Sequence, residues 1–316
     1  MHLVTGGGGF IGSHLVEALN ERGVTDILVV EESRKGCDSP NLADCTVTDC
    51  IDADTFRRML RSDGVTQRLD AIFHQGACTD TMQLDETYMT DNNTRFSKEL
   101  LDLAFRKNIP MIYASSAAVY GGGKDSVEVP ENEVPLNPYG VSKLAFDRHV
   151  RSVFDGARNT LVGLRYYNVY GPNEAQKGRM ASMVYQVYRQ LRRTGVARLF
   201  EGTDGYEDGE QRRDFVFVGD VVKVNLFFAE RPQARGIVNV GTGSSRSFND
   251  IANILIRLLG RGRIEYVPFN RALEGKYQSF TQADLTNLRG LGYDGDFTSL
   301  EAGIERCLTA WQQIPD

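Results

Sequence analysis

Tyr139 and Lys143 are the side chains whose types and spacing most directly suggest chemistry. They lie four residues apart in PYGVSK (138–143), and on a helix this spacing places both on one face. A lysine ammonium so placed can lower the pKa of the phenol, and Ser116 can hydrogen-bond the same substrate oxygen. The three residues together predict general acid/base chemistry on a hydroxyl group, with Tyr139 as the base.

Lys177 is a second candidate for chemistry. It stands in GPNEAQKGRMAS (171–182), a loop rich in glycine and small polar residues. Taken alone, a lysine in such a loop is a solvated surface charge, or it contacts a diphosphate as a point charge. The rest of the chain has to decide whether Lys177 takes part in a reaction.

The chain opens with a strand, a glycine turn and a helix. Residues 2–5 form a short apolar strand, GGGGFIGS (6–13) follows, and apolar residues at helical spacing continue until Gly23. Three glycines of the turn recur at three-residue intervals: Gly6, Gly9 and Gly12. Because glycine lacks a Cβ atom, the chain can turn tightly and a pyrophosphate can approach the helix N-terminus. The pattern predicts a dinucleotide-binding turn.

A second strand and a regular alternation extend this unit. DILVV (26–30) leads into Glu31, where an acidic side chain can accept hydrogen bonds from the ribose hydroxyls of adenosine. Further strands are expected at 71–74, 111–114 and 161–164, with helical stretches such as 93–106 between them. We therefore predict an α/β fold, a doubly wound parallel Rossmann sheet with a second, smaller α/β substrate domain.

Composition narrows the class of function. The 316 residues are 41% hydrophobic and 25% charged, with a net charge of −6 and a pI near 5.4. An acidic balance argues against nucleic acid or an anionic membrane as partner, and the apolar runs are too short to span a bilayer. We therefore expect a cytoplasmic protein that acts on a small molecule.

The cysteines and histidines do not form a metal-binding or disulfide pattern. The five cysteines lack CxxC spacing and the four histidines stand apart from them. We predict reduced thiols packed as small hydrophobic groups, and no metal site.

Four motifs occur in the order typical of the extended short-chain dehydrogenase/reductases: TGGGGFIGS (5–13), SSAAVYG (115–121), PYGVSK (138–143) and RYYNVYGP (165–172). Within that superfamily the chain resembles the ADP-L-glycero-D-manno-heptose 6-epimerases. That resemblance rests on FHQGACTDT (73–81), YMTDNN (88–93), KGRMAS (177–182), RRDFVFVGDV (212–221) and GKYQSFTQADLTNLR (275–289). Together the motifs reach almost to the C-terminus.

The resemblance implies an epimerisation at C6 of an ADP-linked heptose, a step in making the lipopolysaccharide inner core. The C6–H bond is not acidic, so the epimerase oxidises C6 to an aldehyde and reduces it on the other face. Tyr139 and Lys177 would serve as paired acid/bases for the two orientations, with Lys143 and Ser116 beside Tyr139. A related sugar-nucleotide epimerase, a heptose-modifying enzyme of natural-product synthesis and a non-catalytic redox sensor are the alternatives.

The resemblance also implies the cofactor and its contacts. The family uses NADP, and NADP is therefore the expected cofactor. NAD is the alternative, because Glu31, Glu32, Asp38 and Ala53 disfavour a 2′-phosphate, whereas Arg34 and Lys35 could neutralise that acidic cluster. The implied contacts are Gly6, Gly9, Phe10, Ile11, Gly12, Glu31, Glu32, Gln75, Gly76, Ala77, Cys78, Thr79, Asn92, Lys143 and Val169. Without the resemblance, Asn92 would be only a residue at a helix N-terminus.

Substrate contacts are implied mainly in the second half of the chain. They are Ser116, Asn168, Arg179, Gln186, Phe200, Glu201, Gly202, Thr203, Arg213 and Tyr277. Arg213 would hold the diphosphate with its planar donor fork; otherwise it pairs at the surface with Asp208 or Glu210. Tyr277 would complete the pocket; otherwise it is a core aromatic.

The expected domains follow from this order of motifs. Residues 1–166 would form the dinucleotide-binding domain, with returning segments near 212–240 and 272–287, and residues 167–316 mainly the substrate domain. In the first returning segment, Asp220 is expected to be the N-cap of a helix. The resemblance implies a homo-oligomer, with a pentamer as the family precedent.

Overall fold

The computed structural model of the chain describes residues 1–62, 64–65, 67–80, 83–270, 275 and 277–313. It divides into two compact units. The first unit consists of Met1–Val119, Asn137–Arg165 and Val221–Val238, and the second of Tyr120–Leu136, Tyr166–Asp220 and Asn239–Asp316. Of the segments expected to return to the first unit, 221–238 does so, whereas 212–220 and the described part of 272–287 lie in the second unit. Residues 120–136, expected in the first unit, also lie in the second.

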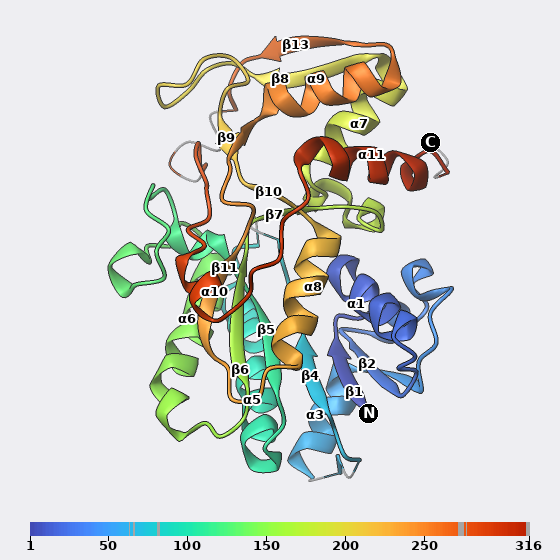
Figure 1. The fold of residues 1–316 in the computed structure, drawn as a ribbon, viewed down its shortest axis with the longest axis vertical. Coiled ribbons are helices and arrows are strands. Elements are labelled where there is room, and N and C mark those ends of the chain that lie inside the picture. The colour runs from blue at the N-terminus through green and yellow to red at the C-terminus, as the bar shows by residue number, and fades with distance from the viewer. Residues whose placement is uncertain (63, 66, 81–82, 271–274, 276, 314–316) are drawn as a thin grey trace. The chain divides into compact units, whose positions relative to one another are not determined.

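The first unit is built on a parallel sheet with seven strands in the described part of the chain (Figure 1). Its strands are β1 (His2–Thr5), β2 (Ile27–Glu31), β3 (Asp49–Asp52), β4 (Ala71–His74), β5 (Met111–Ser116), β6 (Leu161–Tyr166) and β11 (Arg235–Val240). Their order is β11-β6-β5-β4-β1-β2-β3. The run from β3 to β6 is the strand order of a doubly wound dinucleotide fold, which confirms the predicted fold class.

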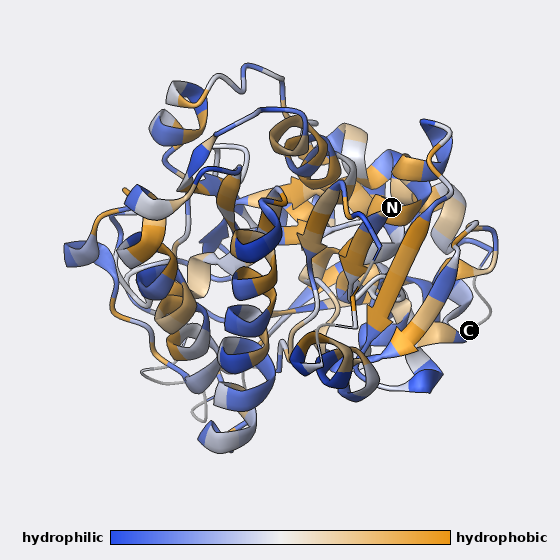
Figure 2. Cartoon of the chain, turned by 90° about the horizontal axis from the view of Figure 1, so that it is seen from below, coloured by the Kyte–Doolittle hydropathy of each residue, from blue (hydrophilic) through white to orange (hydrophobic). Residues whose placement is uncertain are grey.

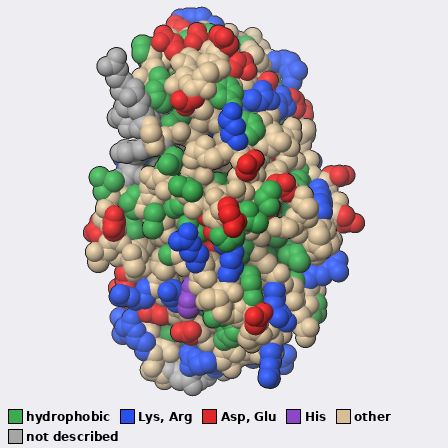
Figure 3. All heavy atoms as spheres, turned by 90° about the vertical axis from the view of Figure 1, so that its left-hand side faces the viewer, with side chains coloured by type: hydrophobic (Ala, Val, Ile, Leu, Met, Phe, Trp, Pro, Cys, Tyr) green, Lys and Arg blue, Asp and Glu red, His purple; other side chains and the backbone are tan. Residues whose placement is uncertain are grey.

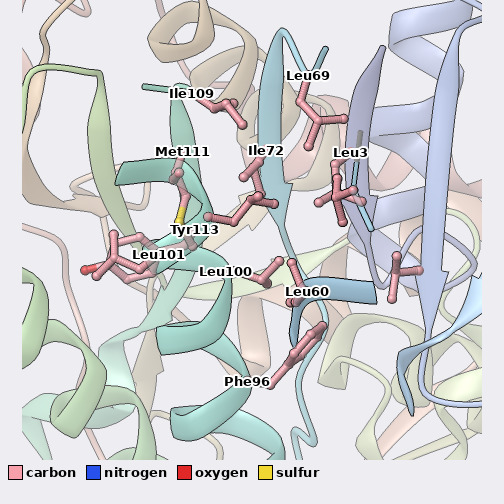
Figure 4. Packing of buried hydrophobic residues seen from close by; sticks show 14 of the residues in the cluster. Leu3, Leu60, Leu69, Ile72, Phe96, Leu100, Leu101, Ile109, Met111 and Tyr113 are labelled. Atoms are coloured by element: carbon pink, nitrogen blue, oxygen red, sulfur yellow. The ribbon is translucent and has the colours of Figure 1, made fainter. Parts of the chain in front are cut away.

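Hydrophobic side chains explain why these segments form the sheet. β4 and β6 are buried along their whole length, as expected for parallel strands covered on both faces. Figure 2 shows the strands beside the N-terminus mainly in orange, the colour of hydrophobic residues. In Figure 4, Leu3, Ile72 and Met111 from three strands lie close to Leu100 and Phe96 of α5, and all five belong to one buried cluster.

Helices connect the strands of the first unit. They are α1 (Phe10–Glu21), α2 (Arg34–Cys37), α3 (Ala53–Arg61), α4 (Glu86–Met89), a π-helical stretch (Thr90–Arg95), α5 (Phe96–Lys107) and α6 (Pro138–Val153). The two units together contain short 3₁₀ turns at Pro40–Leu42, Ala117–Tyr120, Pro130–Asn132, Phe154–Gly156 and Ala175–Met180. α6 begins where a helix should, because Asn137 caps the Gly140 N–H at 2.9 Å and Pro138 occupies the first turn.

The prediction that Asp220 caps a helix is wrong. α8 (Val218–Ala229) begins two residues earlier, so Asp220 lies within its first turn. The Asp220 side chain is fully buried, and its Oδ2 accepts a hydrogen bond from Thr298 N at 2.6 Å. The carboxylate therefore anchors a distant segment of the second unit.

The second unit has short strands and longer helices. Its strands are β7 (Asn168–Tyr170), β8 (Val196–Phe200), β9 (Arg212–Arg213), β10 (Phe215–Phe217), β12 (Arg246–Ser247) and β13 (Arg263–Val267). Its helices are α7 (Met183–Thr194), α9 (Phe248–Leu259), α10 (Thr286–Gly290) and α11 (Leu300–Trp311). β8 pairs with β13 and β7 with β10, both in parallel. Their core is a second buried cluster around Tyr185, Tyr188 and Trp311.

The cysteine prediction needs a correction. Cys37 at the end of α2 and Cys50 in β3 form a disulfide, with Cα atoms 5.7 Å apart. Their separation in sequence hides the pair, because α2 and β3 become neighbours only when the sheet forms. Cys45, Cys78 and Cys307 are free thiols, as predicted.

Membrane-spanning helices and metal-binding clusters are both absent from the described part of the chain. Among the described residues, none of the helices is long and apolar enough to cross a membrane. In the same part of the chain, His, Cys, Asp and Glu side chains do not group in a way that could hold a metal ion. Figure 3 shows basic and acidic side chains interspersed over the face that it displays.

Candidate active site

The glycine turn follows β1, at the carboxyl edge of the sheet. Gly6 adopts a positive φ of 69°, and a Cβ on Gly12 would lie 1.9 Å from the carbonyl oxygen of Gly6. A side chain at either position is therefore incompatible with this backbone. Phe10 and Ile11 start α1 directly after the turn, so the predicted cradle for a pyrophosphate at a helix N-terminus is present.

The loop after β4 lies beside this turn, where the order of the strands reverses. Thr5 pairs with His74 in the register of β1 and β4, and its Oγ1 lies 2.6 Å from His74 Nδ1. The same hydroxyl accepts a hydrogen bond from Gly76 N at 3.0 Å. Burial lowers the pKa of His74 to about 3, so the ring is neutral and structural. Gln75 Nε2 donates to Asn225 Oδ1 at 3.0 Å.

Asn93 organises the rest of this loop, and the sequence did not single it out. Its Oδ1 accepts a hydrogen bond from Cys78 N at 2.8 Å, and its Nδ2 donates to the carbonyl of Cys78 at 3.0 Å. It also donates to Ser142 Oγ at 3.0 Å on α6. Asn92, the predicted cofactor contact, is half-buried and donates to Asn93 Oδ1. The signal was the second asparagine of YMTDNN, next to the predicted one.

Acidic side chains occupy the end of β2. Glu31 Oε1 accepts a hydrogen bond from Gly8 N at 2.6 Å, and burial raises the pKa of its carboxyl. Glu32 is exposed and accepts from the Tyr88 hydroxyl at 2.7 Å. Arg34, expected to neutralise this cluster, donates instead to the carbonyl of Cys50 at 2.5 Å. Asp38 is exposed, and Ala53 is half-buried at the start of α3.

Tyr139, Lys143 and Ser116 come together at the carboxyl end of β5. Tyr139 and Lys143 lie on one face of α6, with the Lys143 Nζ 6.0 Å from the centroid of the Tyr139 ring. The Ser116 side chain lies near enough to the Tyr139 hydroxyl to lower its pKa. Lys143 Nζ donates to the carbonyl of Ala114 at 2.8 Å. This geometry matches the acid/base arrangement expected from the sequence.

The expected effect of Lys143 on Tyr139 is not found in the structure. Burial raises the pKa of Tyr139, and the opposing influence comes from the nearby Ser116 side chain. Lys143 is itself buried, which lowers its pKa to about 8 against the opposing charge of Asp147. A lysine that is partly neutral near neutral pH is a weaker electrostatic partner than the sequence argument assumed.

A buried ion pair joins α6 to β6, and the sequence analysis did not predict it. Asp147 and Arg165 are both fully buried, with Arg165 Nε and Nη2 each 2.9 Å from Asp147 Oδ2. The same carboxylate accepts from the Tyr113 hydroxyl at 3.0 Å and the Ser115 hydroxyl at 2.8 Å. Asp147 lies one helical turn beyond Lys143, so it ties α6 to β5 and β6. The available signal was an aspartate at helical spacing from Lys143.

Lys177 lies in the second unit, in the 3₁₀ turn Ala175–Met180. It is half-buried, which lowers the pKa of its ammonium, and the negative charge of Glu174 opposes that effect. Arg179, in the same turn, is exposed. Lys177 is therefore not the freely solvated surface charge that its loop suggested.

A pocket of about 420 Å³ lies in the second unit. The predicted substrate residues in its wall are Asn168, Gln186, Phe200, Arg213 and Tyr277. Six further residues that the sequence did not single out also line it: Met183, Gln190, Arg198, Leu199, Phe215 and Phe248. Arg179, Glu201, Gly202 and Thr203 are not part of this wall, and Val169 lies in β7 of the same unit.

Arg213 is a pocket residue and not a surface ion pair. It is only 6% exposed, and its guanidinium carbon lies 4.8 Å from the Tyr277 ring centroid and 5.6 Å from that of Phe248. Its Nη1 donates to the carbonyl of Arg212 at 2.9 Å. The carboxylates proposed as alternative partners are engaged elsewhere, Asp208 with Gly202 N and Glu210 with Asn249. A buried cation against aromatic rings suits an anionic ligand with a planar group.

Comparison with known proteins gives consistent matches over the whole chain. Residues 2–241 match the NAD dependent epimerase/dehydratase family. The chain is 50% identical over 315 residues to the ADP-L-glycero-D-manno-heptose-6-epimerase of Alkalilimnicola ehrlichii, covering 100% of this chain and 98% of that protein. The crystal structure of the Helicobacter pylori ADP-L-glycero-D-manno-heptose-6-epimerase matches with a TM-score of 0.84 and 34% identity, covering 99% of this chain and 96% of that chain.

A more distant structure extends the likeness. MoeE5 in complex with UDP-glucuronic acid and NAD matches with a TM-score of 0.80 at 25% identity, covering 98% of each chain. The high TM-scores agree with the Rossmann strand order of the first unit. The chain therefore belongs to the NAD dependent epimerase/dehydratase family and, within it, to the ADP-L-glycero-D-manno-heptose-6-epimerases, isomerases that use a nicotinamide cofactor.

Proposed function

We propose that this chain epimerises C6 of ADP-D-glycero-D-manno-heptose to give ADP-L-glycero-D-manno-heptose. The observation that carries the proposal is the grouping of Tyr139 and Lys143, on one face of α6, with the Ser116 side chain at the carboxyl end of β5. Full-length identity of 50% to an ADP-heptose epimerase supports the choice of substrate. Redox sensing needs the glycine turn alone, whereas this chain retains a complete set of acid/base side chains.

The bound nicotinamide supplies the chemistry of taking a hydride from C6 and returning it to the opposite face. Tyr139 removes the hydroxyl proton as C6 is oxidised, and Ser116 holds the same oxygen. After rotation about the C5–C6 bond the oxygen has a different position, and Lys177 donates the proton there. Lys177 is suited to this task because burial lowers the pKa of its ammonium towards neutrality.

The nucleotide part of the substrate fits the pocket of the second unit. Phe200, Phe248 and Tyr277 offer aromatic surface for a base, and Arg213 offers a buried cation for the diphosphate. We accordingly assign cofactor binding to the first unit and substrate binding mainly to the second. Glu201, Gly202 and Thr203, which follow β8, stay candidate contacts at the margin of the pocket.

The cofactor is proposed to be NAD, although the resemblance alone implied NADP. Glu31 and Glu32 place two carboxylates at the end of β2, where a 2′-phosphate would be repelled and ribose hydroxyls accepted. Arg34 is held by the carbonyl of Cys50. Mass spectrometry of the cofactor released from the purified protein should therefore find NAD. Release of NADP alone would reject this assignment.

The reaction itself is tested by proton NMR. Purified protein, with its retained cofactor and none added, is incubated with ADP-D-glycero-D-manno-heptose, and the C6 epimer should appear. Turnover without added cofactor is expected because each cycle regenerates the starting redox state. No epimer from a sample shown to contain cofactor would overturn the proposed substrate.

The setting of the reaction is proposed from the family. We infer that the enzyme acts in the cytoplasm, as a homo-oligomer with the pentamer as precedent, and serves the lipopolysaccharide inner core. Sedimentation of the purified protein tests the assembly.

A further inference from the structure

Glu174 is a fully buried carboxylate in the same short loop as Lys177. Burying a carboxylate is costly unless hydrogen-bond donors surround it. Three donors do so: Gly171 N at 3.2 Å and Ser182 Oγ at 2.9 Å on Oε1, and Ser182 N at 2.6 Å on Oε2. Lys177 and Arg179 of this segment have roles predicted from the sequence, whereas Glu174 has none.

These donors lie at the two ends of the segment 171–182. Gly171 is where the chain leaves β7, and Ser182 is the N-cap of α7, with its Oγ also accepting from Tyr185 N at 3.2 Å. Between them, the carbonyl of Glu174 accepts from Lys177 N at 3.0 Å. The Glu174 side chain therefore links the start of the segment to the N-terminus of α7. The Glu174 backbone carbonyl, in addition, stabilises the turn that carries Lys177.

Glu174 and Lys177 influence each other's charge. Burial raises the pKa of the Glu174 carboxyl, and the hydrogen bonds from Ser182 and Gly171, together with the charge of Lys177, oppose that rise. Burial lowers the pKa of the Lys177 ammonium, and the Glu174 carboxylate opposes this. The other titratable groups that its charge influences are Tyr185 on α7 and Cys307 on α11, and burial raises the pKa of both. Both are neutral near pH 7, so Lys177 is the group whose charge responds to Glu174.

We propose that Glu174 is a positioning residue for Lys177, closing the loop that carries the ammonium and supplying its counter-charge. The inference rests on the proposed acid/base role of Lys177. Glu174 touches neither substrate nor cofactor in this role. It sets where the ammonium lies and over which pH range it is charged.

The Glu174→Gln variant tests the charge directly. Labelling of the Lys177 amine with acetic anhydride, followed by peptide mass spectrometry across pH, should show a midpoint about one pH unit lower, because an ammonium that loses a nearby carboxylate deprotonates more easily. In the same variant kcat should fall about tenfold with KM almost unchanged, and the limb of the pH–kcat profile that belongs to Lys177 should move to lower pH. Glu174→Asp keeps the charge and should restore the labelling midpoint.

Glu305→Gln is the matched control, since Glu305 is an exposed carboxylate on α11 of the same unit. It should leave labelling and kcat unchanged. If Glu174→Gln does not fold, Ser182→Ala takes over: it loses a donor to Glu174 and should lower kcat several-fold. Ser299→Ala, which removes the N-cap of α11, is its control and should not lower kcat.

The outcomes separate the inference from the proposed function. The positioning role of Glu174 would be overturned if Glu174→Gln kept the wild-type labelling midpoint and the wild-type kcat. It would also be overturned if Ser182→Ala and Ser299→Ala had the same kcat. A Lys177→Ala variant measured alongside addresses the other question. Near wild-type epimerisation by Lys177→Ala would remove the catalytic role of Lys177. The labelling midpoints of the wild type and of Glu174→Gln, both of which retain Lys177, would still report the effect of Glu174 on the charge of that lysine.

Discussion

Replacement of Tyr139 by phenylalanine is expected to lower kcat for epimerisation by about 10²–10⁴-fold, the usual contribution of a positioned acid/base group. The ring is retained, so packing on α6 changes little, and only the hydroxyl near Ser116 is lost. The cofactor should stay bound, because its glycine turn and the loop after β4 are untouched. NMR turnover and mass spectrometry of the released cofactor measure the two properties on one sample.

Tyr266→Phe is the control for this change. Tyr266 is partly exposed on β13 and donates to Asn249 Oδ1 at 3.1 Å. Losing that hydroxyl removes a hydrogen bond of similar kind away from the proposed chemistry. Equal turnover in the two variants would contradict the assignment of Tyr139 as acid/base.

Asp147→Asn is expected to lower the free energy of unfolding by about 3–5 kcal/mol, because it removes the Asp147 carboxylate charge from its ion pair with the fully buried Arg165. That is a large share of the stability of a typical domain. Denaturant unfolding monitored by circular dichroism measures the change. Activity should fall as well, since the same carboxylate holds Tyr113 and Ser115 on β5, next to Ser116.

Two further variants isolate the cause. Glu230→Gln removes one partner of the exposed Arg22–Glu230 pair, and such a pair is worth about 0–1 kcal/mol. Replacing Asp147 by leucine and Arg165 by methionine together removes both buried charges and should recover much of the lost stability. A double variant as unstable as Asp147→Asn would show that packing, and not an uncompensated charge, explains the loss.

Local sequence signals were sufficient for the frame of the first unit. The glycine turn, the strand that ends at Glu31 and the pair Tyr139–Lys143 are short-range patterns, each decided by backbone geometry or helix periodicity. They predicted the Rossmann sheet and the arrangement at the end of β5 without knowledge of distant contacts. The register of β1 with β4 then brings the two cofactor loops together.

Other features depend on residues that are distant in sequence. The Cys37–Cys50 disulfide requires α2 to lie beside β3, and Asp220 was assigned to a helix cap because its true donor, Thr298, is remote. The burial of Arg213 could not be predicted locally, because the rings that cover its guanidinium belong to Tyr277 and Phe248, which are distant in sequence. Burial also governs the pKa of Tyr139, which spacing alone predicted in the wrong direction.

The discontinuous course of the chain has a consequence for synthesis on the ribosome. The first unit is complete only when Val221–Val238 has emerged, since this stretch supplies most of β11, the strand that covers the edge of β6. Until then the nascent sheet presents the unpaired backbone of β6, a buried hydrophobic strand in the finished protein. A nascent chain of this length would therefore be prone to aggregate, and a cell has reason to shield it until the last segment of that unit arrives.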